Sequence, residues 1–180
     1  MLRRADGGST LDVEVLAEDD WAVLRQVRLR ALDDSPAAFL SSYQAEAAAG
    51  EEYWRHRCLA YRWVVARNQH RAVGLVCSVK VLDRPADERH LESIWVDPAH
   101  RRQGVLRAML HHLAELEPEV RSWLVWVLDG NDEARAIYER LGFASTGERQ
   151  LLSTLGRSEE RMRLESKAAV RDLDDPGSVP

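Results

Sequence analysis

One segment constrains the fold of this 180-residue chain more than any other: residues 123–128, Trp-Leu-Val-Trp-Val-Leu. A strand that carries no polar residue must be covered on both faces of its sheet. Helix-like patterns flank it at about 104–116 and about 132–141, and Gly142 is well placed to end the second helix. A further strand is expected at 90–96. This strand–helix–strand–helix succession predicts a sheet with helices on both faces.

The other elements follow from the spacing of apolar residues and from turn-forming residues. Strands are expected at 11–16, 62–67, 72–81, 143–152 and 159–165, and helices at about 20–32 and 44–60. Together these elements form one α/β domain at 11–165. A flexible lead-in at 1–10 precedes it, and a polar, disordered tail at 166–180 follows it.

Composition favours a soluble globular protein and argues against several kinds of partner. Hydrophobic residues make up 45% of the chain and charged residues 31%, and the net charge of −5 argues against general nucleic-acid binding. No apolar run approaches the length of a membrane span. No apolar segment follows Arg3 and Arg4, as a signal peptide would require. A cytoplasmic protein is therefore expected, with Cys58 and Cys77 as buried thiols.

The neighbouring histidines His111 and His112 are not expected to hold a metal ion. Adjacent residues on a helix point in different directions, and no third ligand has a suitable spacing. The sequence therefore predicts no metal site.

The turn between strand 90–96 and helix 104–116 is typical of a phosphate site. It reads Val96-Asp97-Pro98-Ala99-His100-Arg101-Arg102-Gln103-Gly104-Val105-Leu106, with Arg107 directly after it. A glycine-containing turn at a helix N-terminus presents backbone N–H groups, and the helix dipole favours an anion there. The alternative is an ordinary turn whose arginines are solvated at the surface.

A second pattern lies on the helix expected after the apolar strand. It reads Asn131-x-x-Ala134-x-x-x-Tyr138-x-x-Leu141-Gly142-Phe143. The amide and the phenol are seven residues apart, which places them on the same helix face. Each also has a simpler explanation, because Asn131 suits a helix N-cap and Tyr138 suits a core position.

Strand 90–96 carries two ionisable residues in an otherwise apolar pattern. Strict alternation predicts two faces, one with His90, Glu92, Ile94 and Val96 and the other with Leu91, Ser93 and Trp95. His90 is a candidate proton acceptor near neutral pH. Glu92 is a candidate base with a raised pKa, or a group that orients His90 or a substrate ammonium. The alternative is that His90 belongs to the loop and Glu92 pairs with an arginine.

In this order, around a buried strand, the two patterns resemble the GCN5-related N-acetyltransferase (GNAT) superfamily over about 11–165. The later family motif is matched at Asn131, Ala134, Tyr138, Gly142 and Phe143. The cofactor motif, Arg/Gln-x-x-Gly-x-Gly/Ala after Val-x-Pro, is matched from Val96 onward with one departure. Where the family has a small residue that lets the backbone approach a pyrophosphate, this chain has Leu106. Its side chain either turns into the helix packing or weakens cofactor binding.

The resemblance implies a single domain with a mixed, mostly antiparallel sheet of about seven strands, helices on both faces, and strands four and five splayed. It also implies an acetyl-CoA-dependent N-acetyltransferase that acetylates a primary amine of a small molecule or peptide by direct attack in a ternary complex. Two alternatives stay open: a non-catalytic acyl-CoA-binding regulatory domain, and a transferase of a different acyl group. No nucleic-acid, membrane or metal partner is expected, and a homodimer stays open.

Site residues are implied by the same resemblance. Glu92 or His90 takes the proton of the amine, directly or through water, and Tyr138 protonates or hydrogen-bonds the departing sulfur. A backbone amide near Val96 is expected to face the thioester oxygen. The residues expected to contact acetyl-CoA are Ile94, Trp95, Val96, Arg101, Arg102, Gln103, Gly104, Val105, Leu106, Arg107, Asn131, Ala134 and Tyr138.

The acceptor side carries a weaker signal. In the family it is shaped by the region between the first two helices, here 28–54, and by the loop between the closing strands, here 151–159. Four aromatic residues either line a pocket there or belong to the core: Phe39, Tyr43, Tyr53 and Trp54. The helical pattern predicts that Tyr53, Trp54 and Cys58 face inward.

Overall fold

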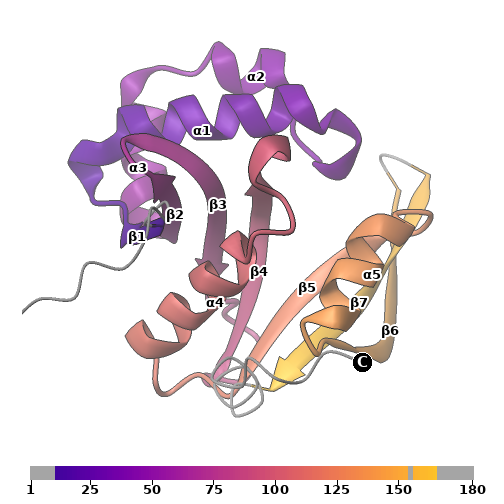
Figure 1. Ribbon diagram of the computed structural model, residues 1–180. Helices are drawn as coiled ribbons and strands as arrows, with labels where there is room; N and C mark the ends of the chain where they lie inside the picture. The colour runs from indigo at the N-terminus through magenta and orange to yellow at the C-terminus, as the bar shows by residue number, and fades with distance from the viewer. Residues whose placement is uncertain (1–10, 154–155, 166–180) are drawn as a thin grey trace, which may run out of the picture.

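The computed structural model describes residues 11–153 and 156–165 (Figure 1). The strands are β1 (Leu11–Val15), β2 (Arg62–Asn68), β3 (Arg71–Val79), β4 (Glu88–Val96), β5 (Ser122–Leu128), β6 (Ala144–Leu152) and β7 (Arg157–Glu165). The helices are α1 (Trp21–Asp34), α2 (Tyr43–Ala47), α3 (Glu51–Ala60), α4 (Val105–Leu116) and α5 (Asp132–Arg140), with short 3-10 turns at Glu18–Asp20, Pro36–Ala38 and Pro98–His100. The lead-in and tail expected at 1–10 and 166–180 lie outside the described residues.

The seven strands form one sheet in the order β1-β2-β3-β4-β5-β7-β6. Each neighbouring pair is antiparallel except β4 and β5, which are parallel. Helices α1 and α3 cover one face of the sheet over β2 to β4, and α4 covers the opposite face (Figure 1). The predicted fold class, a mixed and mostly antiparallel sheet with helices on both faces, is confirmed.

The parallel strands β4 and β5 are paired only near their beginnings, where Glu88–His90 lies beside Ser122–Leu124. Beyond these residues the two strands diverge, as Figure 1 shows, while β4 stays paired with β3 and β5 with β7. The predicted splay of strands four and five is therefore confirmed. Within the described residues, the inner edges of both strands have no strand partner past this point.

Two clusters of buried apolar side chains hold the layers together. One lies between the sheet and helices α4 and α5, and includes Met109 and Trp123, each at most 1% exposed. The other lies between the sheet and helices α1 and α3, and includes the fully buried Trp54. Gly74 of β3 permits the close approach of α4, because a Cβ there would stand 2.8 Å from Cγ1 of Val105.

The single helix predicted at 44–60 is wrong, because α2 and α3 are separated by a break. Gly50 has an extended backbone, with φ −76° and ψ 175°, and forms the N-cap of α3. An extended residue interrupts the helical hydrogen bonds, and glycine loses the most entropy in a helix. Trp54 and Cys58 are buried as predicted, but Tyr53 is 42% exposed.

Cys58 and Cys77 are free and buried, so the prediction of two buried thiols is confirmed. Burial raises the pKa of both thiols, which keeps them protonated near neutral pH. In the part of the chain that the structure describes, no helix has both the length and the apolar character needed to cross a bilayer.

Candidate active site

Strand β4 contains a bulge where it leaves β5. Ser93 has a φ of 56°, in the left-handed region, and the register between β4 and β3 shifts between Leu75 and Cys77. A bulge inserts one extra residue into a strand and changes the face to which the following side chains point. The divergence of β4 and β5 therefore coincides with a local change of direction within β4.

The bulge corrects the predicted faces of this strand. Glu92 and Trp95 each pair with a β3 residue whose side chain lies on the sheet face covered by α1 and α3. Ile94 and Val96 instead pack on the face covered by α4. The prediction that His90 and Glu92 share a face with Ile94 and Val96 is therefore wrong. Strict alternation fails because the extra residue at the bulge shifts the two-residue period by one.

Glu92 is an isolated carboxylate on the middle strand of the sheet. Its side chain is exposed, and it has no hydrogen-bond or ion-pair partner among residues 11–153 and 156–165. Desolvation by the surrounding protein raises its pKa, the charges of Arg57 and Arg28 offset part of that rise, and the charge of Glu159 adds to it. An unpaired carboxylate with a raised pKa is suited to accept a proton.

His90 lies deeper in the same face of the sheet and is 7% exposed. Its Nε2 atom lies 3.4 Å from Nη2 of Arg161. Burial lowers its pKa, and the charges of Arg161 and Arg84 lower it further. A proton added to this imidazole would meet a permanent guanidinium charge, so the surroundings favour Glu92 over His90 as the proton acceptor.

Tyr138 lies on α5, half-buried, with its ring 5.5 Å from that of Phe143 between centroids. Burial raises its pKa to about 12. Its hydroxyl has no hydrogen-bond partner within the described ranges. Since a thiol ionises near pH ~8.5, such a phenol retains its proton beside a thiolate. It is therefore suited to donate a hydrogen bond to sulfur rather than to transfer its proton completely.

The turn before α4 presents uncapped backbone N–H groups. Arg102 and Gly104 have φ values of 59° and 77°, and Gly104, as the N-cap, offers no side-chain acceptor to the first helical turn. A Cβ at Gly104 would meet no atom within 4 Å, so the space in front is open. Arg102 and Arg107 are exposed and have no anionic partner in the described part of the chain. These groups together form a suitable phosphate site.

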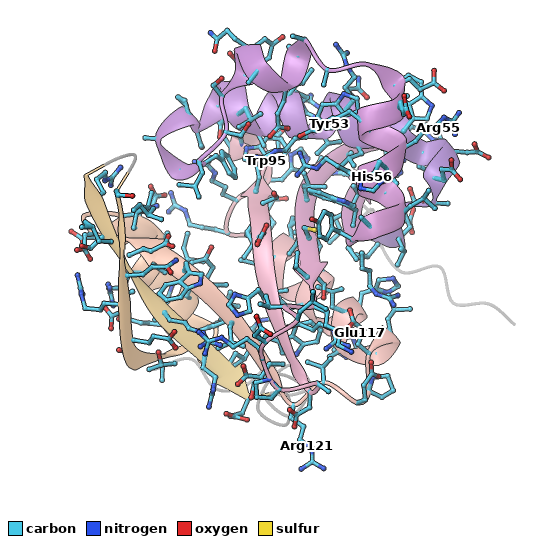
Figure 2. The ribbon with its side chains drawn as sticks, turned by 180° about the vertical axis from the view of Figure 1, so that it is seen from behind. Tyr53, Arg55, His56, Trp95, Glu117 and Arg121 are labelled. Atoms are coloured by element: carbon cyan, nitrogen blue, oxygen red, sulfur yellow. The ribbon has the colours of Figure 1, made fainter. Side chains whose placement is uncertain are left out.

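Other side chains of this turn hold the turn itself in place. Arg101 donates a 2.7 Å hydrogen bond to Oδ2 of Asp34, the last residue of α1. The indole N–H of Trp95 donates to the same oxygen at 3.0 Å, and Figure 2 places Trp95 beside the helical layer. Gln103 Nε2 donates to the carbonyl of Ala99 at 2.9 Å. The side chains of Arg101 and Trp95, both predicted to contact the cofactor, are thus engaged with α1.

Among the other residues predicted to contact the cofactor, Asn131 caps a helix, and Val105 and Leu106 pack in the core. Asn131 is the N-cap of α5, as predicted, because its Oδ1 accepts a 3.2 Å hydrogen bond from the backbone N–H of Ala134. Leu106 is half-buried and packs on the α4 cluster, so its side chain turns into the helix packing. Val105 is 3% exposed and belongs to the same cluster.

Three of the four acceptor-side aromatic residues pack around the α1–α3 core, where the rings of Tyr53 and Trp54 lie 5.1 Å apart between centroids and Phe39 contacts the cluster that contains Trp54. Trp54 is fully buried and belongs to the core, and Phe39 stacks under the guanidinium of Arg28 at 4.5 Å. Tyr43 and Tyr53 are each 42% exposed. Figure 2 places Tyr53 in the helical layer.

Two further residues take part in this region: Asp34 binds the turn through Arg101, and the charge of Glu159 raises the pKa of Glu92. No local pattern marks either one, because both reach the site from distant segments. His111 lies 3.5 Å from Glu115, and among the described residues no group of His, Cys, Asp and Glu is arranged to hold a metal ion.

A mixed sheet whose central parallel strands part beside an uncapped helix N-terminus is the architecture of a GNAT-type acetyltransferase. The family model described as "Acetyltransferase (GNAT) family" matches residues 17–143. The chain belongs to this family.

Solved structures share the fold over most of the chain. The ribosomal-protein-S18-alanine N-acetyltransferase of Escherichia coli is 27% identical with a TM-score of 0.60, covering 87% of this chain and 94% of that one. The ribosomal-protein-S5-alanine acetyltransferase of Vibrio fischeri has a TM-score of 0.70 at 12% identity, covering 90% and 96%. A putative acetyltransferase of Salmonella typhimurium, solved with its cofactor acetyl-CoA, has a TM-score of 0.62 at 16% identity, covering 94% and 97%. The last two likenesses concern the fold alone.

One curated relative matches part of the chain. Human N-acetyltransferase 8 is 29% identical over 89 residues, which are 47% of this chain and 39% of that protein. The chain therefore spans about two fifths of the length of this relative.

Proposed function

We propose that this protein is an acetyl-CoA-dependent N-acetyltransferase that acetylates a primary amine of a small molecule or peptide by direct attack. One observation carries the proposal. The uncapped N-terminus of α4 is joined by the turn at 97–104 to the part of β4 that diverges from β5, and that part carries the unpaired carboxylate of Glu92. An anion-binding turn and a proton acceptor thus belong to the same opening of the sheet.

The residues of the turn fit a co-substrate that carries phosphate groups. Backbone N–H groups at the start of α4 would hold the pyrophosphate, with the exposed guanidinium groups of Arg102 and Arg107 adding charge. Acetyl-CoA supplies the acetyl group as an activated thioester. The packing of Leu106 on the core leaves the helix N-terminus accessible.

Each candidate residue has a distinct task in the transfer. A lysine-like amine arrives protonated, with a pKa near ~10.4, and Glu92 takes one proton from it. The freed nitrogen bonds to the acetyl carbon, the carbon–sulfur bond breaks, and the second nitrogen proton leaves for the thiolate. Tyr138 stabilises that thiolate by donating a hydrogen bond. Neither free cysteine is suited to act as a nucleophile, because both are buried and their raised pKa values keep the thiols protonated. Direct attack by the amine requires no such nucleophile.

The names of relatives support the class of acceptor. They include two alanine N-acetyltransferases of ribosomal proteins and a spermidine N-acetyltransferase, whose acceptors are amines of a peptide and of a small molecule. A primary amine is the chemistry that these acceptors share.

Calorimetric titration with acetyl-CoA, beside coenzyme A without the acetyl group, tests the cofactor site. Micromolar binding is expected, followed by turnover in a screen of primary amines. Binding without turnover of any amine would favour a non-catalytic acyl-CoA-binding domain. Competition among acetyl-, propionyl- and succinyl-CoA would reveal a different acyl donor. No binding up to millimolar concentration would overturn the proposal.

Replacing Gly104 with valine is expected to weaken acetyl-CoA binding at least about tenfold, since one lost hydrogen bond to a charged group is worth about 1.5–3 kcal/mol. A β-branched residue is strained at a φ of 77° and shifts the N–H groups of the turn. Gly147→Val is the matched control, because Gly147 has a φ of 75°, has equally open space, and lies on β6. Equal loss of acetyl-CoA affinity in both variants would contradict this role for the turn.

Replacing Tyr138 with phenylalanine is expected to lower kcat by about 10- to 100-fold, because a hydrogen bond to the developing thiolate is lost. The dissociation constant of acetyl-CoA should stay within about threefold, since thiolate character develops only in the transition state. The exposed Tyr61, changed to phenylalanine, is the control. An unchanged kcat in Tyr138→Phe would remove the phenol from the reaction.

A further inference from the structure

Strand β7 brings a row of charged side chains to the sheet face that carries His90 and Glu92. Alternation along β7 places Glu159, Arg161 and Arg163 on one face, and Glu160 on the other, where it pairs with Arg135 of α5. Arg161 lies within 3.4 Å of His90, which fixes the row to the α1–α3 side of the sheet.

Most carboxylates of this face are neutralised within the protein. Glu88 pairs with Arg161 at 3.1 Å and with Arg163 at 2.7 Å. Glu148 pairs with Arg161 at 2.5 Å and with Arg84 at 2.6 Å. These ion pairs link β4, β6 and β7 and leave no free anion among their members.

Glu92, Glu159 and Glu165 differ, because none of them has a cationic partner in the described part of the chain. Glu165 is exposed and lies where β4 and β5 are paired, whereas Glu92 and Glu159 lie toward the end where the strands are apart. Glu159 is only 7% exposed, and among the described residues its carboxylate accepts one hydrogen bond, from Nε2 of Gln150 at 2.5 Å. A buried carboxylate without a counter-ion is costly, and binding of an external cation relieves that cost.

The position of Glu159 points to the acceptor as that cation. Glu159 pairs in register with Leu128 at the end of β5, where β4 and β5 are apart, whereas Glu165 pairs with Ser122 at the end where they meet. Glu92 lies on the same face of the sheet, past the last β4 residue that pairs with β5, and β5 alone separates the strands of the two carboxylates. The negative charge of Glu159 contributes to the raised pKa of Glu92. A positively charged group between the two carboxylates would neutralise both.

We propose that Glu159 is a positioning residue for the acceptor: its carboxylate holds the ammonium group beside Glu92, so that the site selects cationic primary amines. This inference rests on the proposed acetyl transfer. In the bound state the ammonium donates hydrogen bonds to both carboxylates. When Glu92 takes one proton, the neutral amine stays hydrogen-bonded to Glu159, and no further reactant is required.

Steady-state kinetics of Glu159→Gln test the inference with three probes: 2-phenylethylamine, 1,4-diaminobutane and a hexapeptide with a free N-terminal alanine. KM for the accepted amines is expected to rise at least about tenfold, while kcat changes less than about threefold. Glu165→Gln is the matched control, on the same strand and face at the closed end. An unchanged KM in Glu159→Gln, or an equal rise in Glu165→Gln, would overturn the inference.

A second measurement needs no acceptor. Titration of the Glu92 carboxyl by carbon-13 NMR should give a lower pKa in Glu159→Gln than in the wild type, because a neighbouring negative charge has been removed. Glu165→Gln should leave the titration unchanged. An unaltered Glu92 titration in Glu159→Gln would show that the two carboxylates are not coupled and would overturn the inference.

The failure of the proposed function is distinguishable from the failure of this inference. If the wild type acetylates none of the probes, calorimetry with the same three amines on the coenzyme A-loaded protein decides the matter. Binding that weakens at least about tenfold in Glu159→Gln supports the cation site without acetyl transfer. Absence of binding, or binding that is equal in the two proteins, overturns it.

Discussion

Replacing Glu92 with glutamine is expected to lower kcat by about 10²- to 10⁴-fold, the range that a general base contributes. The amide keeps the size of the side chain but cannot take the proton of the amine. Acetyl-CoA affinity should remain within about threefold, because this side chain faces α1 and α3 rather than the α4 turn. The exposed Glu133, changed to glutamine, serves as the control.

The pH–rate profile gives the Glu92 prediction a second readout. The pKa of Glu92 is raised, so the ionised, proton-accepting form appears only as pH rises through a value above the usual ~4.3. We therefore expect an acid limb of kcat/KM displaced toward higher pH in the wild type and absent in Glu92→Gln. A variant with wild-type rate and profile would assign the proton to His90 or to water.

Replacing Glu46 with glutamine is expected to destabilise the protein by about 3–5 kcal/mol, the cost of removing one partner from a buried ion pair. Glu46 is 3% exposed, and its carboxylate accepts hydrogen bonds from Nε and Nη2 of Arg28, which is 4% exposed. Arg57 lies 3.3 Å from the same carboxylate. Without that anion, two guanidinium groups would remain near each other under α2 and α3.

Urea denaturation checks this loss, with the exposed Glu52 changed to glutamine as the matched control on α3. Burial alone would raise the pKa of Glu46, but the hydrogen bonds and charge of Arg28, with the charge of Arg57, hold it below its usual value. The stabilisation is therefore present above about pH 4.3 and is lost as pH falls through the lower folded-state pKa. A Glu46→Gln variant as stable as Glu52→Gln would show that the pair contributes little.

The sequence alone determined the features that depend on neighbouring residues. Asn131 caps α5 through a bond to Ala134, three residues away, and Gly142 takes a φ of 90° directly after that helix. The uncapped turn at Gly104 and the strand–helix–strand–helix order likewise follow from local patterns. Local hydrogen bonds and side-chain periodicity are encoded within one or two helical turns, so they can be read without the fold.

Only the tertiary structure decided how the candidate site is composed. Arg101 is drawn to Asp34 from 67 residues away, and the bulge at Ser93 separates the face of Glu92 from that of Ile94 and Val96. The strand order places Glu159 of β7 on the sheet face of Glu92, whose pKa its charge raises. Such charges and faces depend on which strands become neighbours and on how much water they exclude. Burial and Coulomb energy act through space, so no local pattern in the sequence specifies them.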